Sequence, residues 1–365
     1  MNILFLTTHV NTGGITSYLL TLGQGLVKKG HKVLVASGGG NCVARFQDAG
    51  IRHVQVNIRT KSEAHPKLLL AWPLLHRLIH EENIDIIHAQ TRVTQVLGYA
   101  LSLGGTVKMV TTCHGFFRPR WFRRMFPCWG DAVIAISQPV ERHLNGDFGV
   151  DAKTIYLIPN GIDLDRFVMT DEQKRRDMRK KWHVNSGQVI GIIARLSDVK
   201  GIDILIKAMP RVLKEIPAAH LMIVGQGPQE SYLKKLTKDL SLTAHVRFEN
   251  TVNQTEELLP IFDVFVMPSL MEGLGLSVME AQACGIPVIA SRVGGLVDLI
   301  EDGTSGYLVD SHDPASLAHR IIEVLKNPYS AHAMAEQARL NIEQYFSAQG
   351  MVSETLKVYE QYSRR

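Results

Sequence analysis

Residues 264–291 read VFVMPSLMEGLGLSVMEAQACGIPVIAS. The apolar run Val264–Pro268 precedes a glycine-containing loop, an apolar helix-like stretch and a second apolar run, Pro287–Ser291. Short β-branched runs separated by helix-length segments are typical of parallel α/β sheets. The stretch therefore predicts a strand, a loop, a helix and a second strand of one such sheet.

The same alternation extends in both directions along the chain. Before the charged segment Asp165–Asn185, which we interpret as a solvated linker with one exposed helix, strands are expected at 3–8, 32–37, 54–58, 84–89, 107–112, 132–137 and 155–159. After it, strands are expected at 189–194, 220–225, 245–248, 264–268, 287–291 and 306–309, and the end of the chain is helical. The fold class is α/β, with two doubly wound parallel-sheet (Rossmann-like) domains facing across a cleft.

The first domain is expected to cover residues 1–168, and a C-terminal helix at about 346–365 crosses back onto it. The second covers residues 169–345. A length of 365 residues supplies two hydrophobic cores, and a net charge of +5 is too small to indicate nucleic acid. Four scattered cysteines without a C-x-x-C pair favour a reduced cytoplasmic compartment and argue against zinc.

Polar motifs follow several expected strands, and ligands of open parallel sheets bind beyond the carboxyl ends of the strands. Gly13 and Gly14 lie between the first strand and a helix, which suits a phosphate or a plain tight turn. Arg195, Lys200 and Gly201 follow the first strand of the second domain. They suit a diphosphate, since arginine offers a fork of donors and lysine a compact charge; a solvated loop is the alternative.

The loop in the opening stretch has carboxylates at both ends. Glu272 lies in the loop and Glu280 about one turn into the helix, and Gly273 and Gly275 leave backbone amides accessible. Carboxylates placed in this way accept hydrogen bonds from sugar or ribose hydroxyls. The alternative is a capping glutamate followed by a surface glutamate.

Together these motifs resemble the retaining glycosyltransferases of family 4, which have the GT-B fold. The resemblance runs over nearly the whole chain, in family order and spacing. It is carried by residues 272–291, by Arg195 with Lys200-Gly201, by residues 159–163 (PNGID), and by Gly294-Gly295, Asp302-Gly303 and Gly306. One departure is Asp298, where the family more often has Glu, at a position that looks structural.

The resemblance implies a role for each matching position. Glu280 binds the donor ribose, Arg195 and Lys200 neutralise the diphosphate, and Gly13 and Gly14 approach that diphosphate when the cleft closes. His114 and Glu272 are the catalytic residues, near the transferred sugar. The sugar and the distal phosphate are held by the loop Gly273, Leu274, Gly275, Leu276 and Ser277. The nucleobase is assigned to Asn250, Thr251 and Val252.

The implied activity is retaining, metal-independent transfer of a hexose-type sugar from a nucleotide-diphosphate sugar, with UDP-sugar favoured and GDP-sugar next. The acceptor is a hydroxyl of a glycan or a lipid-linked glycan. No cofactor or metal is expected, although Asp163-Leu164-Asp165 matches a D-x-D pattern. The alternatives are a catalytically silent nucleotide-sugar-binding protein, which binds without turnover, and a nucleotide-sugar 2-epimerase, which changes the donor without an acceptor.

A basic and aromatic segment, Phe116–Trp129, follows His114 and contains Arg118, Arg120, Arg123 and Arg124. Such a segment can lie among lipid headgroups, so one hypothesis is that it docks a cytoplasmic enzyme at the inner face of an anionic membrane or guides a lipid-linked acceptor. The alternative is an amphipathic helix with its aromatics in the core and its arginines in water.

Overall fold

The computed structural model describes residues 1–63, 65–119, 121–184 and 186–363. Its chain forms two compact units: unit 1 is Met1–Gly161 with Ala348–Arg365, and unit 2 is Ile162–Ser347. Residues 162–168 therefore group with unit 2, not with the first domain as expected. The reason is local: the Ile162 amide donates to the Phe346 carbonyl at 2.8 Å, and Arg166 forms an ion pair with Glu256 at 2.6 Å.

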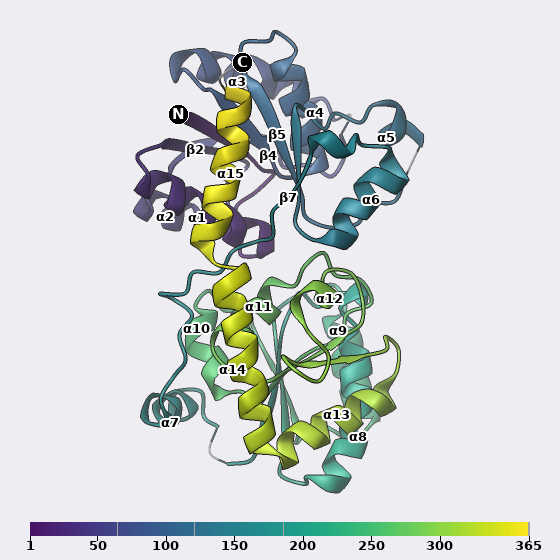
Figure 1. Ribbon diagram of the computed structural model, residues 1–365. Helices are drawn as coiled ribbons and strands as arrows, with labels where there is room; N and C mark the ends of the chain where they lie inside the picture. Colours follow the sequence, from purple (N-terminus) through teal and green to yellow (C-terminus); the bar gives the residue numbers. More distant parts are fainter. Residues whose placement is uncertain (64, 120, 185, 364–365) are drawn as a thin grey trace. The chain divides into compact units, whose positions relative to one another are not determined.

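Unit 1 contains a seven-stranded parallel sheet of order β3-β2-β1-β4-β5-β6-β7 (Figure 1). The register aligns Ile3 with Val33 on one side of β1 and with Ile86 on the other. Its strands are β1 (Asn2–Leu6), β2 (Lys32–Ser37), β3 (Arg52–Gln55), β4 (Ile86–Ala89), β5 (Lys108–Cys113), β6 (Ala132–Ala135) and β7 (Ile155–Leu157). Its helices are α1 (Gly14–Lys28), α2 (Val43–Asp48), α3 (Lys67–Glu81), α4 (Arg92–Ser102), α5 (Trp121–Met125), α6 (Gln138–Phe148), η1 (Ala152–Thr154) and α15 (Ala348–Ser363).

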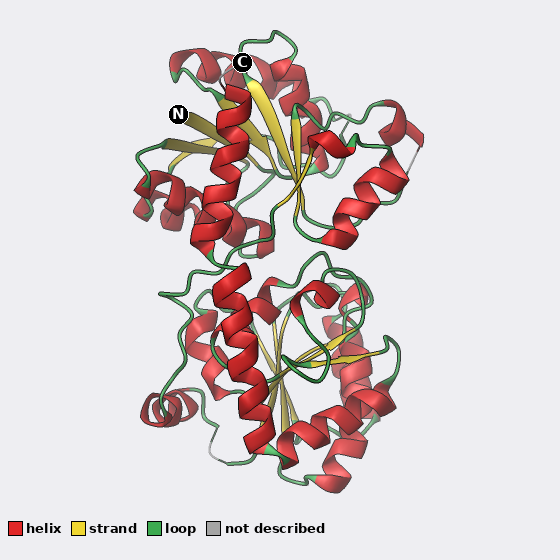
Figure 2. Ribbon diagram, in the orientation of Figure 1, coloured by secondary structure: helices red, strands yellow, loops and turns green. Residues whose placement is uncertain are grey.

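Both faces of the unit 1 sheet are covered by helices (Figure 2). Ile3 and Phe5 pack into a core with α1, α2 and α15, whereas Leu4 and Leu6 pack into a second core with α3 and α4. All four side chains are fully buried. Successive strand residues point to opposite faces, so a strand with both faces covered must be apolar throughout.

The last helix completes the first of these cores. Helix α15 packs along α1, and Val352 and Tyr359 are buried there. Gly25 of α1 permits this close packing, since a Cβ at that position would lie 2.4 Å from a methyl carbon of Val352. The expectation that the final helix returns to the first domain is confirmed.

Unit 2 contains a six-stranded parallel sheet of order β10-β9-β8-β11-β12-β13. Its strands are β8 (Val189–Ile193), β9 (His220–Val224), β10 (Val246–Glu249), β11 (Val264–Met267), β12 (Val288–Ser291) and β13 (Tyr307–Val309). Its helices are α7 (Glu172–Lys181), η2 (Asp198–Lys200), α8 (Ile202–Glu215), α9 (Glu230–Asp239), α10 (Thr255–Leu258), η3 (Leu259–Ile261), α11 (Leu276–Ala283), α12 (Leu296–Leu299), α13 (Pro314–Lys326) and α14 (Pro328–Tyr345).

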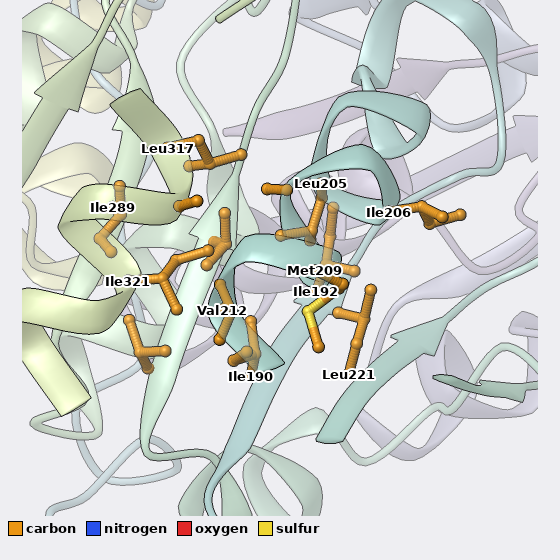
Figure 3. Packing of buried hydrophobic residues seen from close by; sticks show 14 of the residues in the cluster. Ile190, Ile192, Leu205, Ile206, Met209, Val212, Leu221, Ile289, Leu317 and Ile321 are labelled. Carbon is orange, nitrogen blue, oxygen red and sulfur yellow. The ribbon is translucent and has the colours of Figure 1, made fainter. Parts of the chain in front are cut away.

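One core of unit 2 lies between the sheet and helices α8 and α13 (Figure 3). Ile190 and Ile192 of β8 meet Leu205 and Met209 of α8 and Ile321 of α13, and each of these side chains is fully buried. Helix α8 therefore holds the strand that precedes Arg195.

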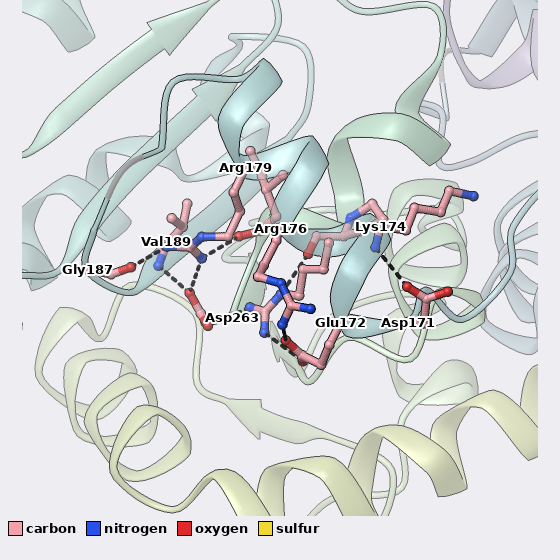
Figure 4. A network of polar contacts seen from close by, with 11 residues as sticks. Asp171, Glu172, Lys174, Arg176, Arg179, Gly187, Val189 and Asp263 are labelled. Carbon is pink, nitrogen blue, oxygen red and sulfur yellow. Dashed lines mark hydrogen bonds and ion pairs between the residues drawn. The ribbon is translucent and has the colours of Figure 1, made fainter.

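The charged segment before β8 is only partly the solvated linker that its composition predicts. It forms the expected helix, α7, which Asp171 caps by accepting from the Lys174 amide at 2.7 Å. Two of its arginines pair with one carboxylate: Arg175 donates to Asp263 at 2.7 Å. Arg179 donates to the same carboxylate at 3.3 Å (Figure 4). Asp263 also accepts from the amide of Val189, so the charges fix α7 to the start of β8.

The predicted α/β class with two parallel sheets is confirmed, and the expected strands lie close to the observed ones with one shift. The third strand was expected at 54–58, but β3 covers Arg52–Gln55. Val56 and Ile58 are buried as in a strand, yet the Ile58 amide donates to the Val56 carbonyl at 2.8 Å. The chain turns out of the sheet there while its apolar side chains stay in the core.

Gly191 of β8 is expected to tolerate no side chain. A Cβ at this position would lie 2.2 Å from the ring of Phe262, and overpacking of this kind costs about 1–3 kcal/mol. We expect Gly191→Ala to lower the calorimetric melting temperature of unit 2. The control is Gly146→Ala in α6, where a Cβ meets no atom within 4 Å and alanine favours the helix. Equal melting temperatures for Gly191→Ala and the wild type would contradict this packing.

Candidate functional site

The strand order of unit 2 brings together two loops that are distant in sequence. Strands β8 and β11 are neighbours, and the sheet grows from them in opposite directions, so the switch point of the sheet lies between them. The loop after β8 and the loop after β11 are joined where the Leu270 amide donates to the Val199 carbonyl at 2.8 Å. Gly201, with φ of 60°, lies so close that a Cβ would be 2.0 Å from the Pro268 carbonyl oxygen.

Two of the predicted side chains meet at this junction. Lys200 Nζ forms an ion pair with Glu272 Oε2, and only 21% and 14% of the two side chains are exposed. The Ser269 hydroxyl also donates to Glu272 Oε2, at 3.3 Å. Arg195 is exposed, and within the described residues no hydrogen bond or ion pair occupies its guanidinium. A partly buried cation and a free cation thus follow the same strand.

The loop from Gly273 to Ser277 leads into α11. Gly275 caps this helix with φ of 104°, and a Cβ there would lie 2.8 Å from a methyl group of Leu296. Gly273, Leu274 and Gly275 are buried. In the part of the chain that the structure describes, no backbone carbonyl accepts from the amides of Leu276 or Ser277. These first-turn amides are therefore donors for an anionic or hydroxyl-bearing ligand.

Glu280, one turn into α11, belongs to a second polar cluster. It accepts a hydrogen bond from the Thr255 hydroxyl at 3.1 Å. Arg166 lies in the same cluster: burial alone would lower its pKa, but the hydrogen bond to Glu256 and the charges of Glu256 and Glu280 raise it. Arg166 also donates to the Asn253 carbonyl at 3.1 Å, which connects this cluster to the segment that follows β10.

The predicted nucleobase residues Asn250, Thr251 and Val252 lie in that segment. The carboxamide of Asn250 accepts from Gln226 at 3.1 Å. Strand β9 separates β10 from β8, so the segment lies two strands away from Arg195 and Lys200. Sequence reasoning missed Thr255, Arg166 and Ser269, because nothing in their local pattern distinguishes them from ordinary loop residues.

In unit 1, two predicted motifs also lie at carboxyl ends of strands. Gly13, which has φ of 158°, precedes the first residue of α1, Gly14, in the connection after β1. A Cβ at Gly13 would meet no atom within 4 Å, so the start of α1 is open to close approach. His114 directly follows β5, which β4 separates from β1.

The His114 side chain is partly buried and held on two sides. Its Nε2 lies 2.8 Å from Oε1 of Gln90, and its ring meets the ring of Tyr18 edge-on with 4.9 Å between centroids. Tyr18 comes from the second turn of α1, so this contact connects the two predicted motifs of unit 1. Burial lowers the pKa of His114 to about 3, which makes the imidazole neutral near neutral pH.

A chain of buried polar groups lies beside His114. The Tyr359 hydroxyl is 2.6 Å from His88 Nδ1, His88 Nε2 is 2.7 Å from the Thr112 hydroxyl, and that hydroxyl is 3.1 Å from Tyr18 Oη. Burial, with a smaller effect from His114, lowers the pKa of His88 to about 3. The sequence could have suggested His88 and Gln90 only through their place at the end of an apolar strand, and it carried no signal for Tyr18 or Tyr359.

The segment Phe116–Trp129 fits neither sequence interpretation completely. Trp129 is buried, but Trp121, Met125 and Phe126 are 70%, 59% and 50% exposed, so the segment does not place all its aromatics in the core. Arg118 and Arg124 are exposed, while Arg123 lies over the ring of Phe117 at 4.8 Å. Arg120 and the side chain of Phe122 lie outside the described residues.

The D-x-D pattern forms a turn, in which Asp163 Oδ1 accepts from the Asp165 amide at 3.1 Å. Among the described residues, no three or more His, Cys, Asp or Glu side chains gather in a way that could hold a metal ion. No helix in the described ranges is long and apolar enough to cross a membrane.

Comparisons with known proteins agree in both units. The family "Glycosyl transferases group 1" matches residues 173–341, and "Glycosyltransferase Family 4" matches residues 12–166. A GDP-mannose-dependent alpha-(1-6)-phosphatidylinositol monomannoside mannosyltransferase of Mycolicibacterium smegmatis is 30% identical over 351 residues, which is 90% of this chain and 89% of the relative. The chain belongs to glycosyltransferase family 4. It is an enzyme that transfers a glycosyl group from a nucleotide sugar.

Two further proteins are similar to this chain over nearly its whole length. N-acetyl-alpha-D-glucosaminyl L-malate synthase of Bacillus anthracis is 27% identical over 370 residues, covering 97% of this chain and 95% of the relative. The crystal structure of HepE of Anabaena in complex with UDP and glucose superimposes with a TM-score of 0.88 at 23% identity, covering 99% of this chain and all of that one. This structural likeness shows that the glycosyltransferase has the GT-B fold.

The buried histidines of unit 1 predict a pH-dependent stability. Because the folded pKa of His88 and of His114 is about 3 instead of 6.5, the unfolded state binds more protons between these values. Unit 1 should therefore lose stability as the pH falls below about 6.5, by at most about 1.4 kcal/mol per pH unit for each histidine.

Urea unfolding at about pH 7 and about pH 5, followed by tryptophan fluorescence, measures the slope of the unfolding free energy against pH. Three of the four tryptophans (Trp72, Trp121 and Trp129) belong to unit 1. His88→Gln should give a shallower slope whatever its absolute stability, whereas a change at His332, 62% exposed on α14, should leave the slope unaltered. A wild-type slope that His88→Gln does not change would contradict the neutral buried state.

Proposed function

We propose that this retaining family 4 enzyme moves a hexose-type sugar from a nucleoside-diphosphate sugar to a hydroxyl of a glycan or a lipid-linked acceptor, without a metal ion. The observation that carries the proposal is the meeting of the loops after β8 and β11 at the switch point of unit 2, where Lys200 pairs with Glu272. Cleavage of the bond between sugar and diphosphate leaves negative charge on the diphosphate. Cations and amides fixed in advance stabilise that charge as it develops.

Groups from the loops after β8 and β11 of unit 2 are proposed to bind the diphosphate and the sugar. The exposed Arg195 guanidinium and the Lys200 ammonium bind the phosphate oxygens, with the amides of Leu276 and Ser277 as further donors. Glu272 orients Lys200 and accepts from hydroxyls of the transferred sugar. Support comes from the low exposure of the Lys200–Glu272 pair, because a partly buried ion pair holds its members in one geometry.

Glu280 is proposed to bind the donor ribose. One of its oxygens accepts from Thr255, and a carboxylate has further lone pairs for ribose hydroxyls. The adjoining segment Asn250–Val252 is proposed to contact the base. Arg166 supports this assignment, because it bonds both to Glu256 of the Glu280 cluster and to the Asn253 carbonyl.

Two alternatives are proposed for the base and the sugar of the donor. The uridine donor that the family resemblance favours finds support in the Anabaena HepE structure, which is a complex with UDP and glucose. The guanosine donor finds support in the Mycolicibacterium relative, whose name specifies GDP-mannose. The Mycolicibacterium relative is more similar in sequence to this chain than HepE is. GDP-mannose is therefore tested with the same weight as the UDP-sugars.

In unit 1, His114 is proposed to contact the transferred sugar, and Gly13 with Gly14 the donor diphosphate. The open surroundings of Gly13 and the amide donors at the start of α1 support the second assignment. The segment Phe116–Trp129 is proposed to dock a cytoplasmic enzyme on an anionic membrane, where a lipid-linked acceptor is found. Its exposed Trp121, Met125 and Phe126 beside Arg118 and Arg124 support this assignment.

The donor assignment predicts different effects for the two glutamates. In a thermal-shift panel of UDP- and GDP-sugars, one class should stabilise the wild type, by about 2.7 kcal/mol at a hundredfold excess over Kd. Glu280→Ala should weaken that donor roughly 10- to 100-fold, the loss of a charged hydrogen bond. Glu272→Ala should instead lower kcat roughly 100- to 1000-fold, since its contacts matter most in the transition state.

Glu301→Ala, which removes an exposed carboxylate of the same unit, is the control and should match the wild type. Binding without transfer on a broad acceptor panel would favour the silent binding protein, and an epimerised donor formed without acceptor would favour the epimerase. A kcat effect for Glu280→Ala with a binding effect for Glu272→Ala would reverse the two roles.

The membrane assignment predicts sedimentation with anionic vesicles but not with neutral ones. Each basic residue near such a surface contributes about 1 kcal/mol, so Arg118→Glu with Arg124→Glu should weaken binding by at least about 2 kcal/mol. Replacing Trp121 and Phe126 by Ser should weaken it by removing buried apolar area. The charge-matched control is Arg77→Glu with Lys153→Glu, two exposed positions elsewhere on unit 1. Indifference of the wild type to anionic vesicles would refute the assignment.

A further inference from the structure

Gln90 is a buried side chain next to His114 that the proposed reaction does not yet use. It directly follows β4, the strand between β1 and β5, and is 3% exposed. Its carboxamide makes two contacts: Nε2 donates to the His88 carbonyl oxygen at 3.3 Å, and Oε1 lies 2.8 Å from His114 Nε2. The Gln90 amide also donates to the Leu6 carbonyl at 3.0 Å, so the residue is held at both ends.

The first contact fixes the orientation of the carboxamide. A backbone carbonyl oxygen only accepts, so the group that faces His88 must be the NH₂. Oxygen Oε1 then faces His114, and it too only accepts. If His114 Nε2 carried no proton, two lone pairs would face each other across 2.8 Å. The contact is a hydrogen bond only when Nε2 carries the proton.

The burial of His114 and its contact with Tyr18 complete the assignment of its tautomer. Burial makes the neutral imidazole the stable form, and a neutral imidazole carries one proton. With that proton on Nε2, Nδ1 has a lone pair, and no hydrogen bond from the described residues occupies it. The edge-on ring of Tyr18, anchored to Thr112 at 3.1 Å, packs against the imidazole and restricts its rotation.

We propose that Gln90 is a positioning residue that fixes the His114 tautomer with its proton on Nε2, so that Nδ1 accepts a hydrogen bond from a hydroxyl of the bound sugar. The second half of this inference rests on the proposed function, whereas the first half concerns the folded protein alone. His114 then serves the sugar as an acceptor and not as a donor. Any hydroxyl that it binds must direct its proton toward Nδ1.

The tautomer is measured directly by long-range proton–nitrogen NMR of protein labelled with ¹⁵N-histidine, with the His114 signals assigned by their loss in His114→Gln. In the wild type we expect a protonated Nε2 and a bare Nδ1. Gln90→Leu should lose this pattern, because nothing then accepts from Nε2. Gln90→Glu should keep it, because a carboxyl group that retains its proton when buried donates to the His88 carbonyl and still accepts from Nε2. Gln95→Leu, at another buried glutamine of unit 1, is the control and should keep it.

A proton on Nδ1 in the wild type, or an unchanged tautomer in Gln90→Leu, would overturn the positioning role. In transfer assays, Gln90→Leu should lower kcat at least about tenfold with little change in donor KM, the loss of one oriented hydrogen bond. Gln90→Glu should recover part of this rate.

A changed tautomer with an unchanged kcat would refute the role of Nδ1 while the proposed function stands. If the wild type has the expected tautomer but transfers no sugar from any donor, the proposed function fails and the fixing of the tautomer by Gln90 is supported. Dispersed proton–nitrogen spectra of the variants distinguish these outcomes from a loss of folding.

Discussion

Parallel strands all run in the same direction, so each connection must lead from the carboxyl edge of the sheet back to its amino edge. This constraint places the loops that contain most of the predicted site residues. In both units it gathers the loops that follow the strands at the carboxyl edge of the sheet. In unit 2 the order of the strands also reverses between β8 and β11, so Lys200 and Glu272, which are 72 residues apart, meet there. The Lys200–Glu272 pair therefore forms because the strand order places β8 beside β11, and neither loop alone would predict it.

Burial then determines what these groups can do. An ion pair with little exposure is expensive to form from solvated charges, and it adds little to stability. Its value lies in a fixed geometry, since an ammonium held in place need not reorganise when charge develops beside it. In unit 1 the same low polarity acts on histidines, which it keeps neutral, so their hydrogen bonds follow from tautomer and not from charge.

The fold and the principal motifs were predictable from the sequence because their signals are local. Alternating apolar runs identified the strands, and Arg195, Lys200, Glu272 and Glu280 stand in a recognisable order. The positioning groups were not predictable. Tyr18 lies in the middle of an amphipathic helix and looks like any core residue, and Gln90 acquires its meaning only when β4 lies beside β5. The charged residues of α7 were predicted to be solvated for a similar reason, because their partner Asp263 is far away in sequence.

The place of Tyr359 near the end of the sequence determines when unit 1 can become complete during synthesis. The Tyr359 hydroxyl contacts Nδ1 of His88, yet Tyr359 lies in α15. The ribosome synthesises this helix only after residues 162–347. At ordinary elongation rates that interval lasts roughly 10 to 40 s. During it, unit 1 has its whole sheet but an open face where α15 belongs, and a buried histidine without its tyrosine. Unit 1 thus begins to emerge before unit 2 but becomes complete only after it, and its exposed core is a surface for chaperones to cover.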